Sequence, residues 1–177
     1  MRVVAIALTA LAVLGGPALA QRTEVESRSL SGPRIGLTVI TGPRADSILR
    51  ANNLEPTISQ FGWHFEQAIR PSRTGGPSFV IQEVLLLGAV ERRVPIPSGT
   101  LLMGIRFPSG LEFGLGPNVT PVGTALAVGF GWSLQYGGVS IPMNYAIVRS
   151  PGIVRHSIMV GYALEQTRDA APAGPRR

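Results

Sequence analysis

The residues of this sequence that come closest to an acid–base pair are His64 and Glu66, two positions apart. In a strand this spacing places both side chains on one face, where the imidazole could act as a base and the carboxylate could orient it. No motif supplies a hydroxyl nucleophile, and no G-x-S-x-G sequence is present. Polar pairs at this spacing are also routine inside a β-barrel. We therefore predict an interior hydrogen-bonding pair and no enzyme, with catalysis as an alternative.

The sequence predicts no metal site, no cofactor and no nucleic-acid partner. The second histidine, His156, is far along the chain from His64, and no carboxylate cluster accompanies either. Gly-x-Gly pairs such as Gly129 and Gly131 lie inside alternating segments and lack the strand-to-helix context of a dinucleotide-binding motif. The sixteen basic residues are all arginine and are scattered, without the basic stripe and interleaved aromatic residues of a nucleic-acid interface.

The first twenty residues have the pattern of a cleavable signal peptide. Arg2 gives a positive start, residues 3–14 form an apolar run, and residues 17–20 end in a small-x-small site. Gly15, Gly16 and Pro17 break the apolar run before it reaches the length that spans a bilayer. Because no cysteine is present, lipid attachment and disulfides are excluded. The expected divisions are a signal peptide over 1–20 cleaved before Gln21, a flexible segment over 21–31, one β-barrel domain over 32–165, and a disordered polar tail over 166–177.

The domain is predicted to be all-β, because bulky and small residues alternate along runs that Gly, Pro, Ser and Asn separate. The clearest run is 122–136, and Gly137-Gly138 predicts a two-residue turn after it. A short helix is predicted near residues 46–53, capped by Asp46, between the first and second strands. Eight strands are counted, near residues 34–39, 60–66, 78–91, 100–107, 111–116, 122–136, 139–148 and 154–164. We predict an eight-stranded antiparallel up-and-down β-barrel.

The face of these strands that carries the small residues distinguishes a soluble barrel from a membrane barrel. A soluble barrel needs an outer face that water can wet, whereas this face is mostly Gly, Ala and Ser, which suits the interior of a narrow barrel. The bulky face would then contact lipid, as in outer-membrane barrels. The predicted lipid-facing residues are Phe61, Trp63, Phe65, Leu126, Val128, Phe130, Trp132 and Tyr136. The predicted interior polar residues are Arg34, Gln60, His64, Glu66, Arg106, Glu112, Asn144 and Arg155.

Two residues conflict with this arrangement. Glu83 is in phase with the apolar Phe79 and Leu85, where a charge near the middle of a membrane is costly, so we expect a bulge near Gln82 that turns it away. Pro142 lies inside a predicted strand and removes a backbone donor, which is tolerated at edges and bulges.

Residues 110–121 (GLEFGLGPNVTP), the Ala-rich strand that follows and residues 139–144 (VSIPMN) resemble uncharacterised small bacterial outer-membrane β-barrel proteins. The architecture is similar to the eight-stranded membrane domains of the OmpA and OmpX type. The resemblance implies export to the outer membrane, with outer-membrane lipid, including lipopolysaccharide, and the barrel-insertion machinery as partners.

The sequence leaves several functions open. The first is a non-catalytic outer-membrane barrel with a structural, adhesive or surface-interaction role. The alternatives are a soluble periplasmic lipocalin-like binder of a small apolar ligand and a lipid-modifying outer-membrane enzyme centred on His64 and Glu66. An open sandwich remains as an alternative architecture. Arg73, Arg92 and Arg93 fall in predicted loops, where they could meet lipopolysaccharide phosphates, although solvated turn charges are the simpler interpretation.

Overall fold

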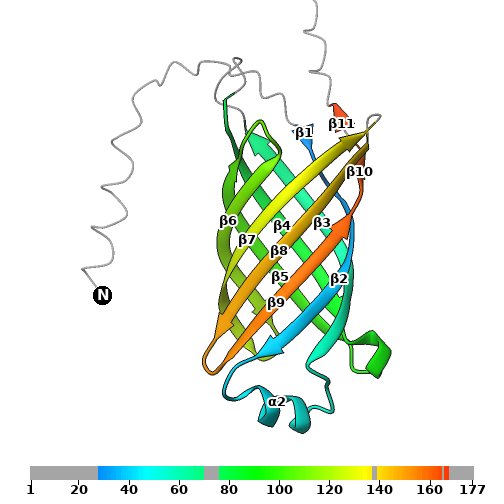
Figure 1. Cartoon of the computed structure of the whole chain (residues 1–177), viewed down its shortest axis with the longest axis vertical. Helices are drawn as coiled ribbons and strands as arrows, with labels where there is room; N and C mark the ends of the chain where they lie inside the picture. The colour runs from blue at the N-terminus through cyan, green and yellow to red at the C-terminus, as the bar shows by residue number, and fades with distance from the viewer. Residues whose placement is uncertain (1–27, 70–75, 137–138, 165, 168–177) are drawn as a thin grey trace, which may run out of the picture.

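The computed structural model describes residues 28–69, 76–136, 139–164 and 166–167. The predicted signal peptide and its cleavage site, the Gly137-Gly138 turn, Arg73 and residues 168–177 of the predicted tail lie outside the described residues. Eight antiparallel strands form the barrel (Figure 1). They are β2 (Gly32–Thr41), β3 (Thr57–Ile69), β4 (Ser78–Gly88), β5 (Ile96–Arg106), β6 (Leu111–Thr120), β7 (Gly123–Tyr136), β8 (Val139–Ser150) and β9 (Ile153–Gly161).

Each barrel strand pairs with the next in the chain, and β9 pairs back with β2 from Arg34↔Gly161 to Thr41↔Val154. The sheet is therefore closed, and the prediction of an eight-stranded antiparallel up-and-down barrel is confirmed. Closure removes the free sheet edges that an open sandwich would leave.

Three short strands lie at the end of the barrel where the chain enters and leaves (Figure 1). β1 (Arg28–Ser29) pairs with β11 (Gln166–Thr167), and β10 (Ala163–Leu164) pairs with β8. Residues 28–29 and 166–167 thus have regular structure, which differs from the flexible lead-in and disordered tail expected there. The reason is that the two segments leave the barrel at the same end, where their backbones can pair.

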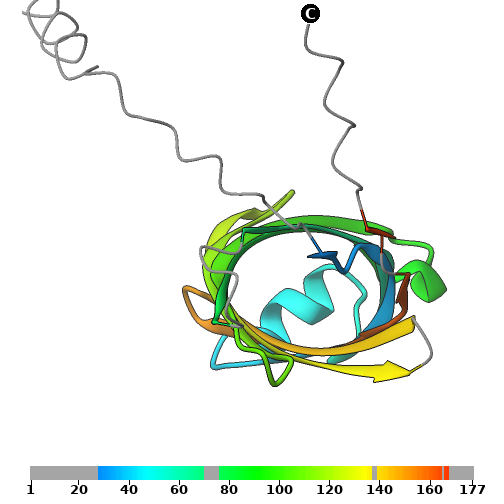
Figure 2. The same cartoon turned by 90° about the horizontal axis from the view of Figure 1, so that it is seen from above.

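The predicted helix between the first two barrel strands is present as α2 (Ala45–Ala51). Its N-cap is Arg44 and not the predicted Asp46, which lies in the first turn. The helix begins earlier because the Arg44 N–H donates to the Gly152 carbonyl in the β8–β9 turn, at 3.0 Å. α2 lies across the far opening of the barrel with Ala45 and Leu49 buried (Figure 2).

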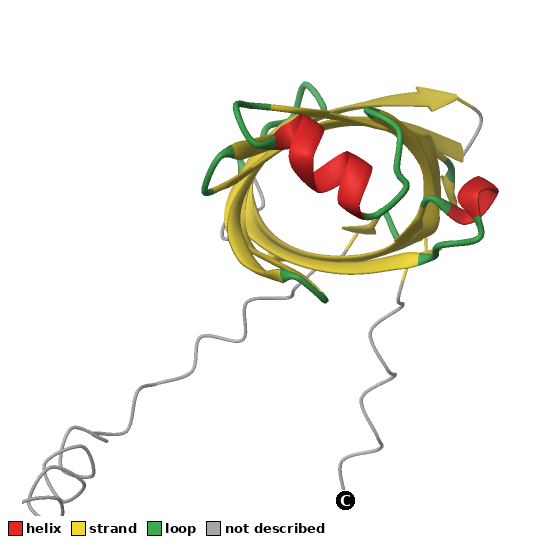
Figure 3. Cartoon of the chain, turned by 90° about the horizontal axis from the view of Figure 1, so that it is seen from below, coloured by secondary structure: helices red, strands yellow, loops and turns green. Residues whose placement is uncertain are grey.

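A second short helix, η1 (Val90–Arg92), connects β4 to β5. Viewed from below, η1 lies outside the ring of strands, whereas α2 crosses the opening (Figure 3). Across the part of the chain that is described, no helix is both long enough and apolar enough to cross a membrane.

The alternation on β7 shows which way the bulky face points. Leu126, Phe130 and Trp132 are 58%, 44% and 49% exposed, whereas Ala127 and Gly129 between them are buried. Bulky side chains therefore cover the outside of the barrel, and small residues leave room inside it.

The bulge expected near Gln82 does not form, so that expectation is wrong. Glu83 pairs with Phe65 on β3 and with Leu101 on β5 in ladders that continue without an inserted residue. Its side chain is exposed on the outer wall. The register is fixed by its neighbours, because Gln82 and Val84 both point inward and are buried there.

Pro142 lies at an interruption of the ladder, which fits the missing backbone donor. On one side it pairs with Ser133 of β7. On the other side, the pairing of β8 with β9 stops at Met143↔Val160 and resumes with β10 at Ser140↔Ala163. The register is the same on both sides of this gap, so Pro142 lies opposite Gly161, where the ladder lacks a pair.

Candidate functional site

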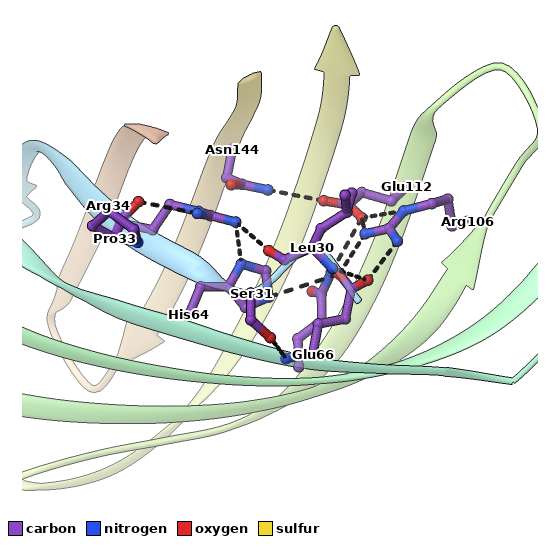
Figure 4. Close-up of polar contacts among 10 residues, drawn as sticks. Leu30, Ser31, Pro33, Arg34, His64, Glu66, Arg106, Glu112 and Asn144 are labelled. Atoms are coloured by element: carbon purple, nitrogen blue, oxygen red, sulfur yellow. Dashed lines mark hydrogen bonds and ion pairs between the residues drawn. The ribbon is translucent and has the colours of Figure 1, made fainter. Parts of the chain in front are cut away.

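A cluster of charged side chains fills the barrel near the end where the chain enters (Figure 4). At its centre the Arg106 guanidinium contacts two carboxylates. Nη1 donates to Glu66 Oε1 at 2.5 Å, and Nε and Nη2 donate to Glu112 Oε2 at 3.0 and 2.5 Å. Nη2 also donates to Glu66 Oε2. One cation therefore holds two carboxylates that would otherwise repel each other, with the forked geometry that arginine favours.

Amide side chains complete this cluster from two other strands. Gln82 Nε2 donates to Glu112 Oε2 at 3.1 Å, and Asn144 Nδ2 donates to Glu112 Oε1 at 2.9 Å. β3, β4, β5, β6 and β8 each contribute one of these five side chains, so the cluster ties most of the wall together. Such a network stabilises when its members are satisfied.

The segment before β2 enters the cluster from the chain-entry end. The Leu30 N–H donates to Glu66 Oε1 at 3.3 Å, and Ser31 Oγ accepts from the Glu66 N–H at 3.0 Å. Arg34 Nη2 donates to the Leu30 carbonyl at 3.1 Å. Leu30 is buried, so this segment covers the polar cluster as α2 covers the opposite opening.

His64 and Glu66 lie together, but in an arrangement that does not suit catalysis. Arg34 Nη2 donates to His64 Nδ1 at 2.8 Å, and because a guanidinium can only donate, Nδ1 must accept and Nε2 carries the proton. His64 Nε2 is 3.9 Å from Glu66 Oε2, whose carboxylate Arg106 already binds. This distance is too long for a hydrogen bond, so the expectation that the two side chains form a hydrogen-bonding pair is wrong. Both side chains are buried. The imidazole thus has no free lone pair with which to accept a substrate proton.

A second polar cluster lies between the middle of the barrel and α2. Thr38 Oγ1 donates to Gln60 Oε1 at 2.7 Å and lies 2.6 Å from Ser157 Oγ. Beside it, Arg155 Nη2 donates to Asn118 Oδ1 at 2.5 Å. Six buried apolar side chains lie next to this second cluster, namely Val84, Leu86, Leu102, Ala127, Val148 and Met159. Of these, Val84, Leu102 and Met159 also lie beside Arg34 and His64.

The described interior contains small cavities, and a larger space of about 170 Å³ lies at the chain-entry end beside Leu30, Ser78 and Arg106. A cavity of about 30 Å³ lies beside Arg34, His64 and Glu112, and one of about 40 Å³ lies beside Gln60, Asn118 and Arg155. Ligand-binding pockets are about tenfold larger or more than these two cavities. The barrel is therefore filled by side chains, as expected for eight strands.

The structure places the sixteen residues singled out from the sequence on two sides of the wall. The interior residues are Arg34, Gln60, His64, Glu66, Arg106, Glu112, Asn144 and Arg155. Gln60 and Arg155 belong to the second polar cluster or lie beside it, and the other six lie in or next to the first. Outside are Phe61, Trp63, Phe65, Leu126, Phe130, Trp132 and Tyr136, all exposed, and the half-buried Val128.

Sequence reasoning missed several interior residues. Gln82 was hidden because its segment is apolar on both faces, so neither parity stood out. Thr38, Asn118 and Ser157 share the parity of small residues in their strands, which is a signal that could have found them. Nothing in the sequence indicated that Leu30 and Ser31 enter the barrel. Within the described ranges, no group of three or more metal-ligating side chains occurs.

Comparison with known proteins bears on the fold. By sequence, the chain matches no protein-family model and no curated protein. By structure, it is similar to the crystal structure of Ail, the attachment invasion locus protein of Yersinia pestis. The TM-score is 0.50 at 12% sequence identity, covering 78% of this chain and 99% of Ail. The chain has the fold of a small outer-membrane β-barrel.

A second structure of Ail, in complex with the heparin analogue sucrose octasulfate, is similar with a TM-score of 0.31 at 12% identity, over 80% of this chain and 99% of that one. The expected resemblance to eight-stranded barrels of the OmpA and OmpX type is confirmed as a resemblance of fold.

Proposed function

We propose that this protein is a non-catalytic barrel of the bacterial outer membrane that presents an interaction surface at its α2 end. The observation that carries the proposal is the outer wall. Exposed bulky apolar side chains occur on every barrel strand, for example Leu37, Phe61, Leu115 and Ile158. A band of this kind matches the hydrocarbon region of a bilayer and would be a poor surface in water.

The soluble lipocalin-like alternative receives no support from the interior. A lipocalin needs an internal cavity for its ligand. The two cavities in the middle of the barrel hold little more than a water molecule each, and the space of about 170 Å³ at the chain-entry end is smaller than a ligand pocket. Its outer wall would also expose Trp63 and Trp132 to water. The enzyme alternative is disfavoured because Arg34 occupies the His64 Nδ1 lone pair and Arg106 binds the Glu66 carboxylate.

The lengths of the connections give the proposed orientation. Outer-membrane barrels have short turns on the periplasmic side and longer loops outside. The longest connection between barrel strands is 42–56, which contains α2, and 89–95, which contains η1, is at the same end. The α2 end would therefore face outward, and β1 and β11, at the opposite end, would lie on the periplasmic side.

The α2 end offers a surface of mixed charge. Connections 42–56 and 89–95 carry four arginines and three carboxylates, all exposed: Arg44, Asp46, Arg50, Glu55, Glu91, Arg92 and Arg93. Such a surface suits polar partners outside the cell. Ail is named an attachment invasion locus protein, and attachment is one interaction of this kind. The filled interior supports a role at the surface and not in transport.

Single-cysteine labelling tests this proposal, because the natural sequence contains no cysteine. Ser47→Cys places a thiol on α2, and the matched Ser109→Cys places one in the exposed turn at the opposite end. A membrane-impermeant maleimide should label position 47 on intact cells and position 109 only after the outer membrane is permeabilised. Labelling of both positions only after permeabilisation would contradict the proposal, and so would labelling of 109 alone on intact cells.

A further inference from the structure

A hollow of about 730 Å³ interrupts the outer wall close to the α2 end. It spans β3, β4, β5 and β6, and outward-facing residues form most of its lining. The residues that matter here are Phe61, Leu85, Leu87, Pro97, Gly99 and Val119. The lining is apolar, and the hollow opens to the outside and not into the barrel. It therefore belongs to the face that we propose contacts lipid.

The hollow exists because Gly99 has no side chain at an outward position. Further along β5 the outward positions carry bulky residues such as Leu101 and Met103. Gly99 pairs with Leu85 on one side and Val119 on the other, and these two form walls around the gap. A Cβ built on Gly99 would meet only Leu85 Cδ2, at 3.6 Å, so the space beyond it is open.

The η1 connection joins β4 and β5, the two strands at the centre of the hollow, at the α2 end of the barrel. Glu91 anchors this connection to the outer wall by accepting hydrogen bonds from the Ser59 N–H, at 3.0 Å, and from the Ser59 hydroxyl. Arg92 forms an ion pair with Glu55. Arg93 is exposed, and among the described residues no ion pair or side-chain hydrogen bond is assigned to it.

We propose that this hollow binds an acyl chain of an outer-leaflet lipid whose anionic phosphate headgroup lies against Arg93. The inference rests on the proposed membrane location and orientation. In a bilayer an apolar notch in the wall is filled by hydrocarbon, and a chain that enters it gains close packing on three sides. An arginine at the headgroup level then favours a phosphate monoester over a zwitterionic headgroup through charge-assisted hydrogen bonds.

The chain contains its own reporter for this site. Of its two tryptophans, Trp63 pairs with Leu85 beside the hollow, whereas Trp132 lies on β7. A Trp132→Phe background leaves Trp63 as the only tryptophan, and Trp63→Phe gives the matched control. Bromine atoms on an acyl chain quench tryptophan only at short range, so quenching reports a chain held next to the ring.

The experiment places the refolded protein in phosphatidylcholine vesicles that contain a small fraction of a dibrominated lipid. The brominated probe is either phosphatidic acid or phosphatidylcholine. We expect phosphatidic acid to quench Trp63 about two- to fivefold more effectively, the range of an exposed charge pair, and to quench Trp132 no more than phosphatidylcholine does. Equal quenching of Trp63 by both probes would overturn the proposal.

Two variants separate the parts of the site. Gly99→Leu should fill the hollow and lower quenching by both probes, whereas Leu126→Phe, which adds bulk elsewhere on the wall, should change neither. Arg93→Gln should remove the preference for phosphatidic acid, whereas Arg50→Gln on α2 should keep it. A preference for phosphatidic acid that survives Arg93→Gln overturns the proposal, and so does quenching by both probes that Gly99→Leu leaves unchanged.

Failure of the membrane location has a different signature. A protein that does not insert shows no faster-migrating folded band on an unheated gel, and vesicles made entirely of brominated lipid do not quench either tryptophan. That result overturns both proposals. Insertion with equal quenching by the two probes overturns the lipid site alone.

Discussion

Arg106 and Glu66 are 40 residues apart in the chain and meet inside the barrel, where Arg106 Nη1 donates to Glu66 Oε1 at 2.5 Å. The same guanidinium binds Glu112 from the neighbouring strand. The two carboxylates are tolerated together because this cation lies between them. The polar cluster therefore depends more on Arg106 than on either acid.

We predict unequal effects of substitutions in this cluster. Arg106→Leu leaves two buried carboxylates without their cation and should lower the free energy of unfolding by about 3–5 kcal/mol. Glu66→Gln leaves Arg106 paired with Glu112 and should cost less, about 1–3 kcal/mol. Urea unfolding of the refolded protein in vesicles, followed by tryptophan fluorescence, measures both. Equal losses would show that the two carboxylates do not share one cation.

Two glycines on β5 give a prediction about packing. A Cβ on Gly104 would lie 2.0 Å from the Phe113 carbonyl oxygen, whereas one on Gly99 meets no atom closer than 3.6 Å. Gly104→Ala should therefore force the backbone to shift and cost about 1–3 kcal/mol, while Gly99→Ala should be close to neutral. The same unfolding measurement compares them, and a Gly99→Ala loss as large as that of Gly104→Ala would contradict the geometry.

Glu83 provides a test of what covers the outer wall. It is in the middle of β4 and exposed on the face proposed to contact lipid, between Phe65 and Leu101. In a bilayer, Glu83→Leu should raise the free energy of unfolding by about 1–2 kcal/mol, since an acidic side chain at mid-membrane costs less than a basic one. The free energy of unfolding of Glu83→Gln should fall between those of the unmodified protein and Glu83→Leu. A loss of stability in Glu83→Leu would show that the carboxylate has a favourable partner there.

The barrel itself could be predicted because alternation leaves a direct record in the sequence. From Leu126 to Leu134 on β7, Ala, Gly or Ser separates each bulky residue from the next. The structure buries these small residues and exposes the bulky ones, except the half-buried Val128. The interior pairing could not be predicted in the same way. Parity places Glu66, Arg106 and Glu112 inside, but which carboxylate meets which cation depends on the stagger of three strands.

Other features depend on contacts that local sequence does not encode. Residues 21–31 have no periodicity, so the burial of Leu30 against Glu66 was not visible. The start of α2 is set by the Arg44 contact to Gly152, more than a hundred positions away, and not by the capping preference of Asp46. The only indication of the hollow in the sequence of β5 is Gly99 itself, a glycine at an outward position in a strand whose later outward positions carry bulky residues.

The η1 connection should respond to acid. The hydroxyl and backbone N–H of Ser59 hold the pKa of Glu91 below its usual range. A carboxyl whose pKa is lowered on folding stabilises the folded connection above its ordinary pKa, and this contribution is lost as the pH falls through the lowered value. Hydrogen exchange of the Ser59 N–H, corrected for intrinsic rates, should therefore show protection that decreases in acid.

The matched variant for this prediction is Glu91→Gln, whose side chain does not titrate. Its Ser59 protection should be weaker at neutral pH and should not change over the acidic range. If the unmodified protein and Glu91→Gln lose protection in parallel, the carboxylate is not what anchors η1.

The membrane location itself is tested most directly by fractionating cells that express the protein and comparing boiled with unboiled samples of each fraction by gel electrophoresis. The outward apolar wall and the filled interior predict that the protein is found in the outer-membrane fraction and migrates faster unboiled than boiled. Recovery in the soluble periplasmic fraction, with the same mobility before and after boiling, would contradict the account.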